Sequence, residues 1–228
     1  MSNSQTTASD KPARRTRRPG RPEGQTNLAD EILDAAEIMF AELGYSGTTL
    51  RQVAEKLGVT PAMIAYYFQS KDNLFRAVFL RRGQGISDSR MERLSELEGK
   101  PGKIVEDLVR AFIEPSARLY GDQQGRAFLR LHARLHMEPE ALSFELRRTV
   151  YNESTRAYAR AFAELLPQLS EREIYQRMSL LIGAYLYAFS GTSRLGEFLV
   201  TDEGESTRGL TENIIAFGTA GMMSRSNV

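Results

Sequence analysis

The segment TTLRQVAEKLGVTPAMIAYYFQSKDNL, residues 48–74, contains the start and stop signals of several short helices. Thr49 and Gln52 form a capping box, because the threonine oxygen accepts a free backbone N–H and the glutamine caps the threonine in return. Gly58 stands directly after Leu57, where a helix ends in a left-handed residue, a conformation that glycine adopts at little cost. These signals predict one short helix that ends at Leu57.

Two further helices start inside the same segment. Thr60 caps the second helix, and Pro61 occupies its first position, where the missing N–H costs nothing. Ser70 caps the third helix. Two helices joined by a short turn that contains glycine form a helix-turn-helix, whose second helix commonly enters the major groove of DNA.

The second helix of this motif has an unusual outer face. If Ile64 is its buried centre, helical geometry places Ala62 and Tyr66 on the opposite side. Met63 and Ala65 flank that pair, so the outer face carries no charge, which is unusual for a solvated helix. Such a face suits base readout by apolar contacts and by the tyrosine hydroxyl. The alternative is a helix that packs on another surface.

A basic arm, residues 1–26, precedes the motif. It holds six arginine and lysine residues against two acidic ones, whereas the whole chain has a net charge of only +1. Its low hydrophobicity predicts disorder. The run RRPGRP, residues 17–22, resembles minor-groove hooks, with Arg18 and Arg21 as the predicted contacts. The alternative is a solubilising or phosphate-binding tail, and either form assists DNA binding in a salt-dependent way.

Residues 27–80 resemble the DNA-binding domain of the TetR family of transcriptional regulators. The resemblance rests on the apolar residues from Ile32 to Leu43, on Gly44–Tyr45, and on TTLRQVA (48–54), GVT (58–60), YYFQSK (66–71) and Leu74. It implies an all-α fold of about nine helices. In that fold a three-helix DNA-binding domain at 27–80 is followed by a larger effector-binding and dimerisation domain at 81–228.

The resemblance also implies DNA contacts. Backbone phosphates would be contacted by Thr49, Tyr67 and Lys71, bases by Thr60, Pro61, Ala62, Met63 and Tyr66, and DNA by Arg51 from the preceding helix. Ala65 departs from the family pattern, which usually has an aromatic residue there. Lys71 also has an independent argument, because a cation at a helix N-terminus is mildly unfavourable unless a phosphate lies nearby.

The rest of the chain has a helical pattern. Helices are predicted at 71–97, 104–120, 126–137, 139–166, 171–190 and 207–223, with a break at 99–102 and a polar loop at 191–206.

The last two predicted helices have apolar surfaces that favour self-association. On the first, Leu180, Leu186 and Tyr187 widen the apolar stripe, and an arc so wide must be covered on two sides. Family members dimerise through their last two helices, so the resemblance implies a homodimer and a palindromic operator. The predicted interface residues are Ile174, Met178, Leu181, Tyr185, Ile214 and Phe217. The alternative is that this arc is internal core.

The middle helices are predicted to enclose a pocket for a small apolar or amphipathic effector. The candidate lining residues are Phe112, Arg118, Phe128, Leu131, His132, Leu135, Tyr151, Tyr158 and Phe162. Arg118, Arg130, Arg134 and His132 are possible anchors for a carboxylate or phosphate. Residues 126–147 weakly resemble the family branch that responds to fatty-acyl effectors, and drug-like or aromatic effectors stay equally open. The alternative is that the apolar stripe is core.

Composition excludes several classes of function. The chain has no cysteine, which rules out disulfides and thiolate metal sites. His132 and His136 lie four residues apart but lack the H-E-x-x-H pattern, so neither a metal nor a cofactor is expected. No apolar run approaches the ~20 residues that span a membrane and no secretory signal is present, so a cytoplasmic protein without a membrane partner is expected.

Two functional hypotheses follow, and an enzyme is not one of them, because no phosphate loop or catalytic triad can be found. The first is a sequence-specific repressor that a small-molecule effector releases from a palindromic operator. The alternative is an effector-independent or architectural DNA-binding protein that uses the basic arm.

Overall fold

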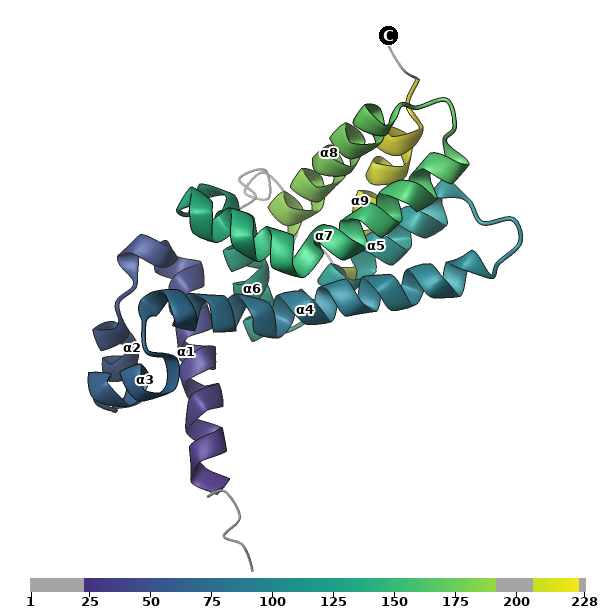
Figure 1. Cartoon of the computed structure of the whole chain (residues 1–228). Helices are drawn as coiled ribbons and strands as arrows, with labels where there is room; N and C mark the ends of the chain where they lie inside the picture. Colours follow the sequence, from purple (N-terminus) through teal and green to yellow (C-terminus); the bar gives the residue numbers. More distant parts are fainter. Residues whose placement is uncertain (1–22, 192–206, 226–228) are drawn as a thin grey trace, which may run out of the picture.

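The computed structural model describes residues 23–191 and 207–225, and all regular secondary structure in this part of the chain is helical. It contains nine α-helices and one short 3₁₀ helix, as the resemblance implied (Figure 1). Residues 1–22, including Arg18 and Arg21 of the predicted hook, lie outside the described residues. Residues 192–206, which make up nearly all of the predicted loop at 191–206, also lie outside the described residues.

The N-terminal unit consists of α1 (Glu23–Gly47), α2 (Leu50–Leu57) and α3 (Pro61–Phe68). Helix α1 begins at Glu23, so the last four residues of the predicted arm, 23–26, are helical. The capping predictions are confirmed: the Thr49 hydroxyl accepts from Gln52 N, and Gly58 is left-handed with φ 68°. Thr60 likewise caps α3 by accepting from Met63 N.

Helix α4 (Lys71–Glu98) joins the N-terminal unit to the rest of the molecule, and Ser70 caps it as predicted. It extends along both regions in Figure 1. Gly83 lets α4 approach α7 closely. A Cβ at Gly83 would lie 3.0 Å from Val150 Cγ1 and 3.2 Å from the Tyr151 hydroxyl.

The remaining helices form the C-terminal bundle. Their bounds are α5 Val105–Leu119, α6 Gln123–Arg134, the 3₁₀ helix Leu135–Met137, α7 Glu140–Leu165, α8 Glu171–Phe189 and α9 Thr207–Met223. Each begins and ends within about three residues of the prediction, because caps and breakers act locally. No helix in the described ranges is long and apolar enough to cross a membrane.

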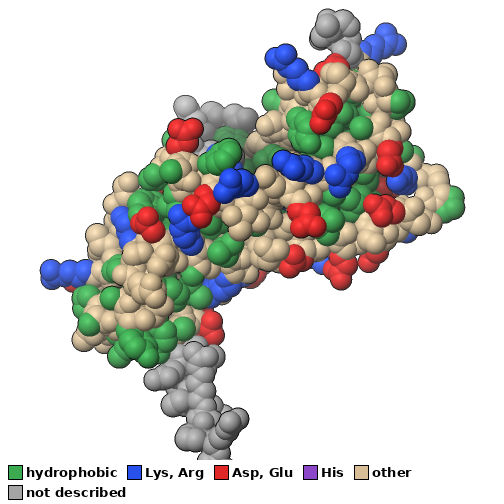
Figure 2. Space-filling view, viewed as in Figure 1, with side chains coloured by type: hydrophobic (Ala, Val, Ile, Leu, Met, Phe, Trp, Pro, Cys, Tyr) green, Lys and Arg blue, Asp and Glu red, His purple; other side chains and the backbone are tan. Residues whose placement is uncertain are grey.

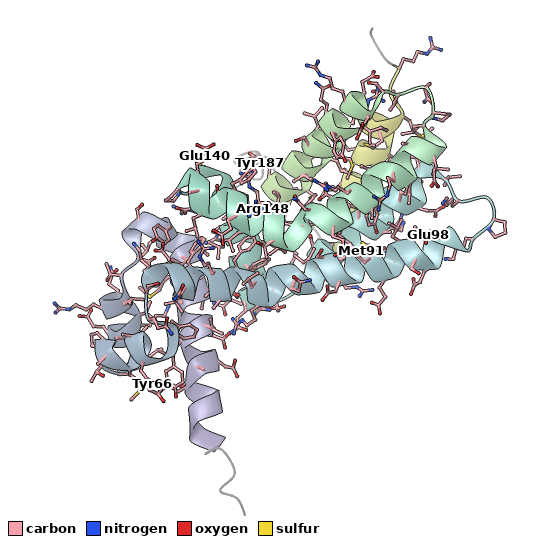
Figure 3. All side chains as sticks on the ribbon, in the orientation of Figure 1. Tyr66, Met91, Glu98, Glu140, Arg148 and Tyr187 are labelled. Atoms are coloured by element: carbon pink, nitrogen blue, oxygen red, sulfur yellow. The ribbon has the colours of Figure 1, made fainter. Side chains whose placement is uncertain are left out.

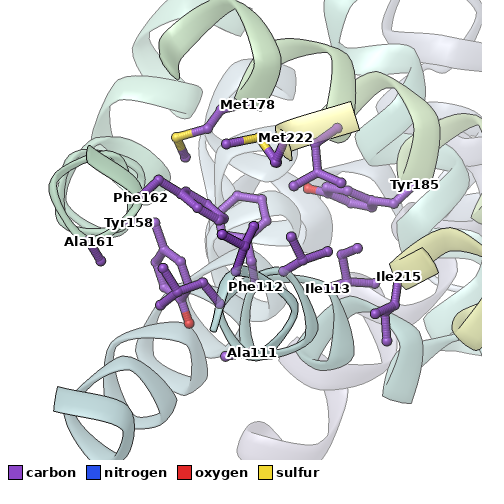
Figure 4. Packing of buried hydrophobic residues seen from close by; sticks show 14 of the residues in the cluster. Ala111, Phe112, Ile113, Tyr158, Ala161, Phe162, Met178, Tyr185, Ile215 and Met222 are labelled. Atoms are coloured by element: carbon purple, nitrogen blue, oxygen red, sulfur yellow. The ribbon is translucent and has the colours of Figure 1, made fainter. Parts of the chain in front are cut away.

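The core of the bundle corrects the predicted dimer interface. Ile174, Met178, Leu181, Tyr185 and Ile214 are buried within a single chain, so the alternative of internal core is right for them. Figure 4 shows Met178 and Tyr185 packed with residues of α5, α7 and α9. The stripe on α8 is the face turned towards the other helices of its own chain. Phe217 differs, because it is 69% exposed.

Candidate nucleic-acid interface and ligand cavity

The outer face of α3 is exposed, as the sequence predicted. Ile64 is completely buried, and Ala62, Met63 and Ala65 are all exposed on the solvent side. Tyr66 is 73% exposed and points away from the body of the molecule (Figure 3). Its ring meets that of the half-buried Tyr67 edge-on at 5.3 Å between centroids. Helix α3 therefore offers an uncharged aromatic surface that is partly fixed in orientation.

Basic side chains lie around this face rather than on it. Hydrophobic and other uncharged side chains cover much of the view over α2 and α3 in Figure 2. Arg51 is exposed on α2, but its guanidinium pairs with Glu55 at 2.8 Å. The Thr49 hydroxyl is engaged in its capping box. The outer face of α3 thus carries no charge of its own, and the nearby Arg51 is already paired within the chain.

Lys71 and Tyr45 form a joint between the end of α1 and the start of α4. Lys71 Nζ donates to the Tyr45 carbonyl at 3.0 Å and lies 4.2 Å from the centre of its ring. The Tyr45 hydroxyl donates to Asp72, and burial together with this bond raises the pKa of Tyr45 to about 12. Tyr45 N donates to Glu138 Oε1 at 3.1 Å, which ties the N-terminal unit to the C-terminal bundle.

The link between α3 and α4 is strained. Gln69 has φ 64° and ψ −44°, and among the described residues it is the one non-glycine residue with positive φ. Ser70 N donates to the Phe68 carbonyl at 2.7 Å, so the backbone closes a tight γ-turn at Gln69. This turn sets the direction in which α4 leaves the outer face of α3.

A buried carboxylate holds α1 against α4. Glu37 is completely buried and accepts from Arg82 Nε, with 2.8 Å from Nε to Oε2, and Arg81 Nη2 lies 3.4 Å from the same oxygen. Arg81 also pairs with Asp34 at 2.7 Å. Burial raises the pKa of Glu37, while the two guanidinium groups oppose that rise. The partners in this cluster come from separate helices, so no local pattern in the sequence predicts it.

A cavity of about 1070 Å³ lies where the end of α1 meets α4, α6, α7 and α8. His132 and Tyr151 line it as predicted, and so do the proposed anchors Arg130 and Arg134. The His132 ring stacks on Tyr151 with 4.9 Å between centroids. Tyr185, expected at a dimer interface, lines this cavity instead.

Most of the other predicted lining residues belong to the core. Phe112, Phe128, Leu131, Leu135, Tyr158 and Phe162 are buried and are absent from the cavity wall. Their apolar stripes face neighbouring helices, as the alternative reading held, whereas more polar faces of α6, α7 and α8 line the cavity. Arg118 lines a separate hollow of about 340 Å³ beside α4 and α5.

Arg90 also lines the cavity and was not predicted from the sequence. It is only 2% exposed, and it lies midway between the buried Ile86 and Leu94 on α4. That spacing of four residues on each side places an arginine in an apolar stripe. The irregularity is visible in the sequence and could have identified the position.

Two family models match the chain. The model described as "Bacterial regulatory proteins, tetR family" matches residues 32–78, and the model "Tetracyclin repressor-like, C-terminal domain" matches residues 110–221. The first covers α2, α3 and parts of α1 and α4, and the second covers most of the bundle.

Two curated relatives match the chain over short stretches. The transcriptional repressor AcnR of Corynebacterium glutamicum is 43% identical over 53 residues, which is 23% of this chain and 28% of that protein. The negative regulator IcaR of the icaADBC biofilm operon of Staphylococcus aureus is 38% identical over 48 residues, or 21% and 26% of the two chains. The chain thus spans less than a third of the length of these two relatives.

Solved structures share the fold over most of both chains. A TetR-family transcriptional regulator from Bordetella parapertussis has a TM-score of 0.61 at 18% identity, covering 84% of this chain and 94% of that one. A chain from Clostridium perfringens, described as a fatty acid metabolism regulator, has a TM-score of 0.60 at 23% identity, with coverage of 86% and 100%.

Proposed function

Because the chain belongs to the TetR family of bacterial regulatory proteins, we propose that it is a transcriptional repressor that binds a palindromic operator as a homodimer. A small molecule in the cavity would release it from DNA, and it would act in the cytoplasm. The observation that supports this function best is the exposed, uncharged outer face of α3, which is presented beside the capped turn of a helix-turn-helix.

In this proposal Tyr66 reads bases while Lys71 and Tyr67 contact phosphates. Tyr66 is exposed and its hydroxyl can bond a base edge, whereas Lys71 stands at the N-terminus of α4, where an anion is favoured. Lys71 would exchange its bond to the Tyr45 carbonyl for a phosphate. Thr49, Arg51, Thr60, Pro61, Ala62 and Met63 complete the proposed DNA surface.

The test is a binding titration on the promoter DNA beside the protein's own gene, with an unrelated duplex as competitor at fixed salt. Tyr66→Ala should weaken operator binding about 10-fold or more and leave binding to the unrelated duplex unchanged. Lys71→Ala should weaken both equally. Equal selectivity of the wild type and Tyr66→Ala would refute the assigned reading face. Binding that ignores sequence altogether would favour the effector-independent alternative.

The dimer would use the outer faces of α8 and α9. Leu180 is 73% exposed, Tyr187 is 52% exposed and Phe217 is 69% exposed, so large apolar side chains remain uncovered there in the single chain. Sedimentation should show that Leu180→Glu with Phe217→Glu converts a dimer to a monomer. Ile104→Glu, at another exposed apolar side chain, should stay dimeric. Unchanged sedimentation of the double variant would place the interface elsewhere.

A further inference from the structure

Arg90 is a buried cation at the wall of the cavity. Its Nε donates to the Phe112 carbonyl at 2.8 Å, and its Nη2 donates to the Tyr185 hydroxyl at 3.0 Å. The guanidinium carbon lies 3.8 Å from the centre of the Phe112 ring and 5.6 Å from that of Tyr185. All of these partners are neutral, and in the described part of the chain no carboxylate pairs with Arg90.

An uncompensated charge at this depth is unfavourable, since removing a guanidinium from water costs more than neutral hydrogen bonds return. Other arginines of the same helix are arranged differently. Arg82 pairs with Glu37 at 2.8 Å, and Arg93, three residues after Arg90, pairs with Glu114 at 2.5 Å. The missing counter-ion is therefore specific to the arginine that borders the cavity.

The other charged groups of the cavity wall are also mostly basic. Arg130 and Arg134 lie four residues apart on α6, and each donates to backbone carbonyls, Arg130 to Ser190 and Arg134 to Glu42. Arg147 of α7 adds a further guanidinium. Among the described residues that line the cavity, Glu138 is the one carboxylate, and it already accepts the Tyr45 N–H. Four guanidinium groups thus face one engaged carboxylate.

Part of the wall is apolar. Leu43 comes from α1, and Ile182 and Leu186 come from successive turns of α8, so an apolar strip runs beside the basic groups. At about 1070 Å³ the cavity is at the upper end of the range for drug-sized ligands. It has room for both a charged head and an apolar body.

We infer that the cavity binds an amphipathic organic anion, whose carboxylate or phosphate head pairs with Arg90 and whose apolar body lies against Ile182 and Leu186. The flat fork of a guanidinium matches both kinds of head, with two parallel hydrogen bonds to adjacent oxygens. The ligand supplies the counter-ion that the chain lacks. The role of this anion as effector rests on the proposed function, whereas its binding requires no DNA.

Calorimetry on the full chain without DNA tests the inference with decanoate, decyl phosphate and decanamide. The two anions should bind the wild type about 10- to 100-fold more tightly than the neutral amide, as expected for a charged hydrogen-bonded pair. The better of the two anions identifies the head. Equal binding of all three probes, or binding of none, would overturn the inference.

Arg90→Met separates recognition of charge from a structural role. It should bind decanoate and decanamide equally, because the apolar wall remains while the preference for the anion is lost. Arg93→Met, on the same helix but outside the cavity, should keep the wild-type preference. Arg130→Met offers a second comparison at the cavity wall and should also keep the preference, because in this inference the head of the anion pairs with Arg90. A preference for the anion that survives in Arg90→Met would contradict the inference.

DNA binding is measured separately, so the two proposals fail separately. If the chain prefers the anions to the amide but does not bind the operator, the proposed function alone is refuted. Operator binding by a chain that ignores decanoate and decyl phosphate would refute the anion site alone.

Discussion

Helix α4 carries two inward guanidinium groups in opposite electrostatic settings. Arg82 meets Glu37 of α1 at 2.8 Å and completes a charge pair within the chain. Arg90, two turns further along, meets only a carbonyl, a hydroxyl and aromatic rings. Both groups are largely removed from water. The difference lies in the partner, because the first has its counter-ion on a neighbouring helix and the second faces a cavity.

The contrast shows how one helix combines a structural joint with a ligand site. A buried pair whose two charges are both present tolerates burial but is strongly destabilised when one partner is removed. A buried cation without a counter-ion lowers the stability of the empty protein. A bound anion then supplies that counter-ion. Removing the carboxylate beside Arg82 should therefore lower the free energy of unfolding, whereas replacing Arg90 should not lower it.

Glu37→Ala should produce the largest effect. Removing the carboxylate leaves Arg81 and Arg82 facing a buried gap, and loss of one member of a buried ion pair costs about 3–5 kcal/mol. Urea denaturation should show this as a lower midpoint. Asp34→Ala is the matched control, because Asp34 is partly exposed and pairs with the same Arg81. It should cost less than about 1 kcal/mol. If the two variants lose equal stability, the buried pairs of Glu37 contribute no more to stability than the partly exposed pair of Asp34.

Arg90→Met should not lower the free energy of unfolding, in contrast to Glu37→Ala. Replacing an uncompensated buried charge by an apolar side chain of similar length should leave the free energy of unfolding unchanged or raise it by about 1–4 kcal/mol. The same urea titration, run without ligand, measures the change. A loss of more than about 2 kcal/mol would show that Arg90 serves the fold through Phe112 and Tyr185. The contrast with Arg82 would then disappear.

Gln69→Gly tests the strain at the start of the same helix. Glycine tolerates positive φ without a Cβ clash, so the variant should be more stable by about 1 kcal/mol. Gln69→Ala serves as control, because alanine keeps the Cβ and should show no gain. Thermal unfolding of the three proteins measures both. Equal unfolding temperatures would mean that the γ-turn at Gln69 is not strained.

The smallest effect should appear at high pH. The pKa of Tyr45 is raised from 10 to about 12, so the folded state holds this proton more tightly than the unfolded state. The resulting stability is complete below pH 10 and is lost as the pH rises towards about 12. Tyr45→Phe should lose less stability than the wild type across this interval. If the stability of the two proteins falls equally between pH 10 and about 12, the loss does not come from Tyr45.

The sequence predicted the N-terminal unit well and the cavity poorly. The caps at Thr49, Gly58 and Thr60 involve neighbours within a few residues, so their chemistry is local and readable. The outward position of Tyr66 followed from the buried position of Ile64 on the same helix. His132 and Tyr151 of the cavity were also found, but Arg90 was not. Its place in an apolar stripe is a visible irregularity, but the stripe alone does not reveal that this position borders a cavity.

The surface of α8 shows the same limit. Its apolar arc predicted cover on two sides, but periodicity could not say which side faces its own chain. The fold turned Ile174 and Met178 inward and left Leu180 and Tyr187 outside.

The sequence by itself determined the order and bounds of the helices and the uncharged outer face of α3, because capping and helical periodicity act over a few residues. Only the tertiary structure decided which arginine of α4 is neutralised. Arg82 meets a carboxylate 45 residues away in sequence, and Arg90 meets a tyrosine 95 residues away. Such pairings depend on how the helices pack, since electrostatic partners are set by distance in space and not by position along the chain.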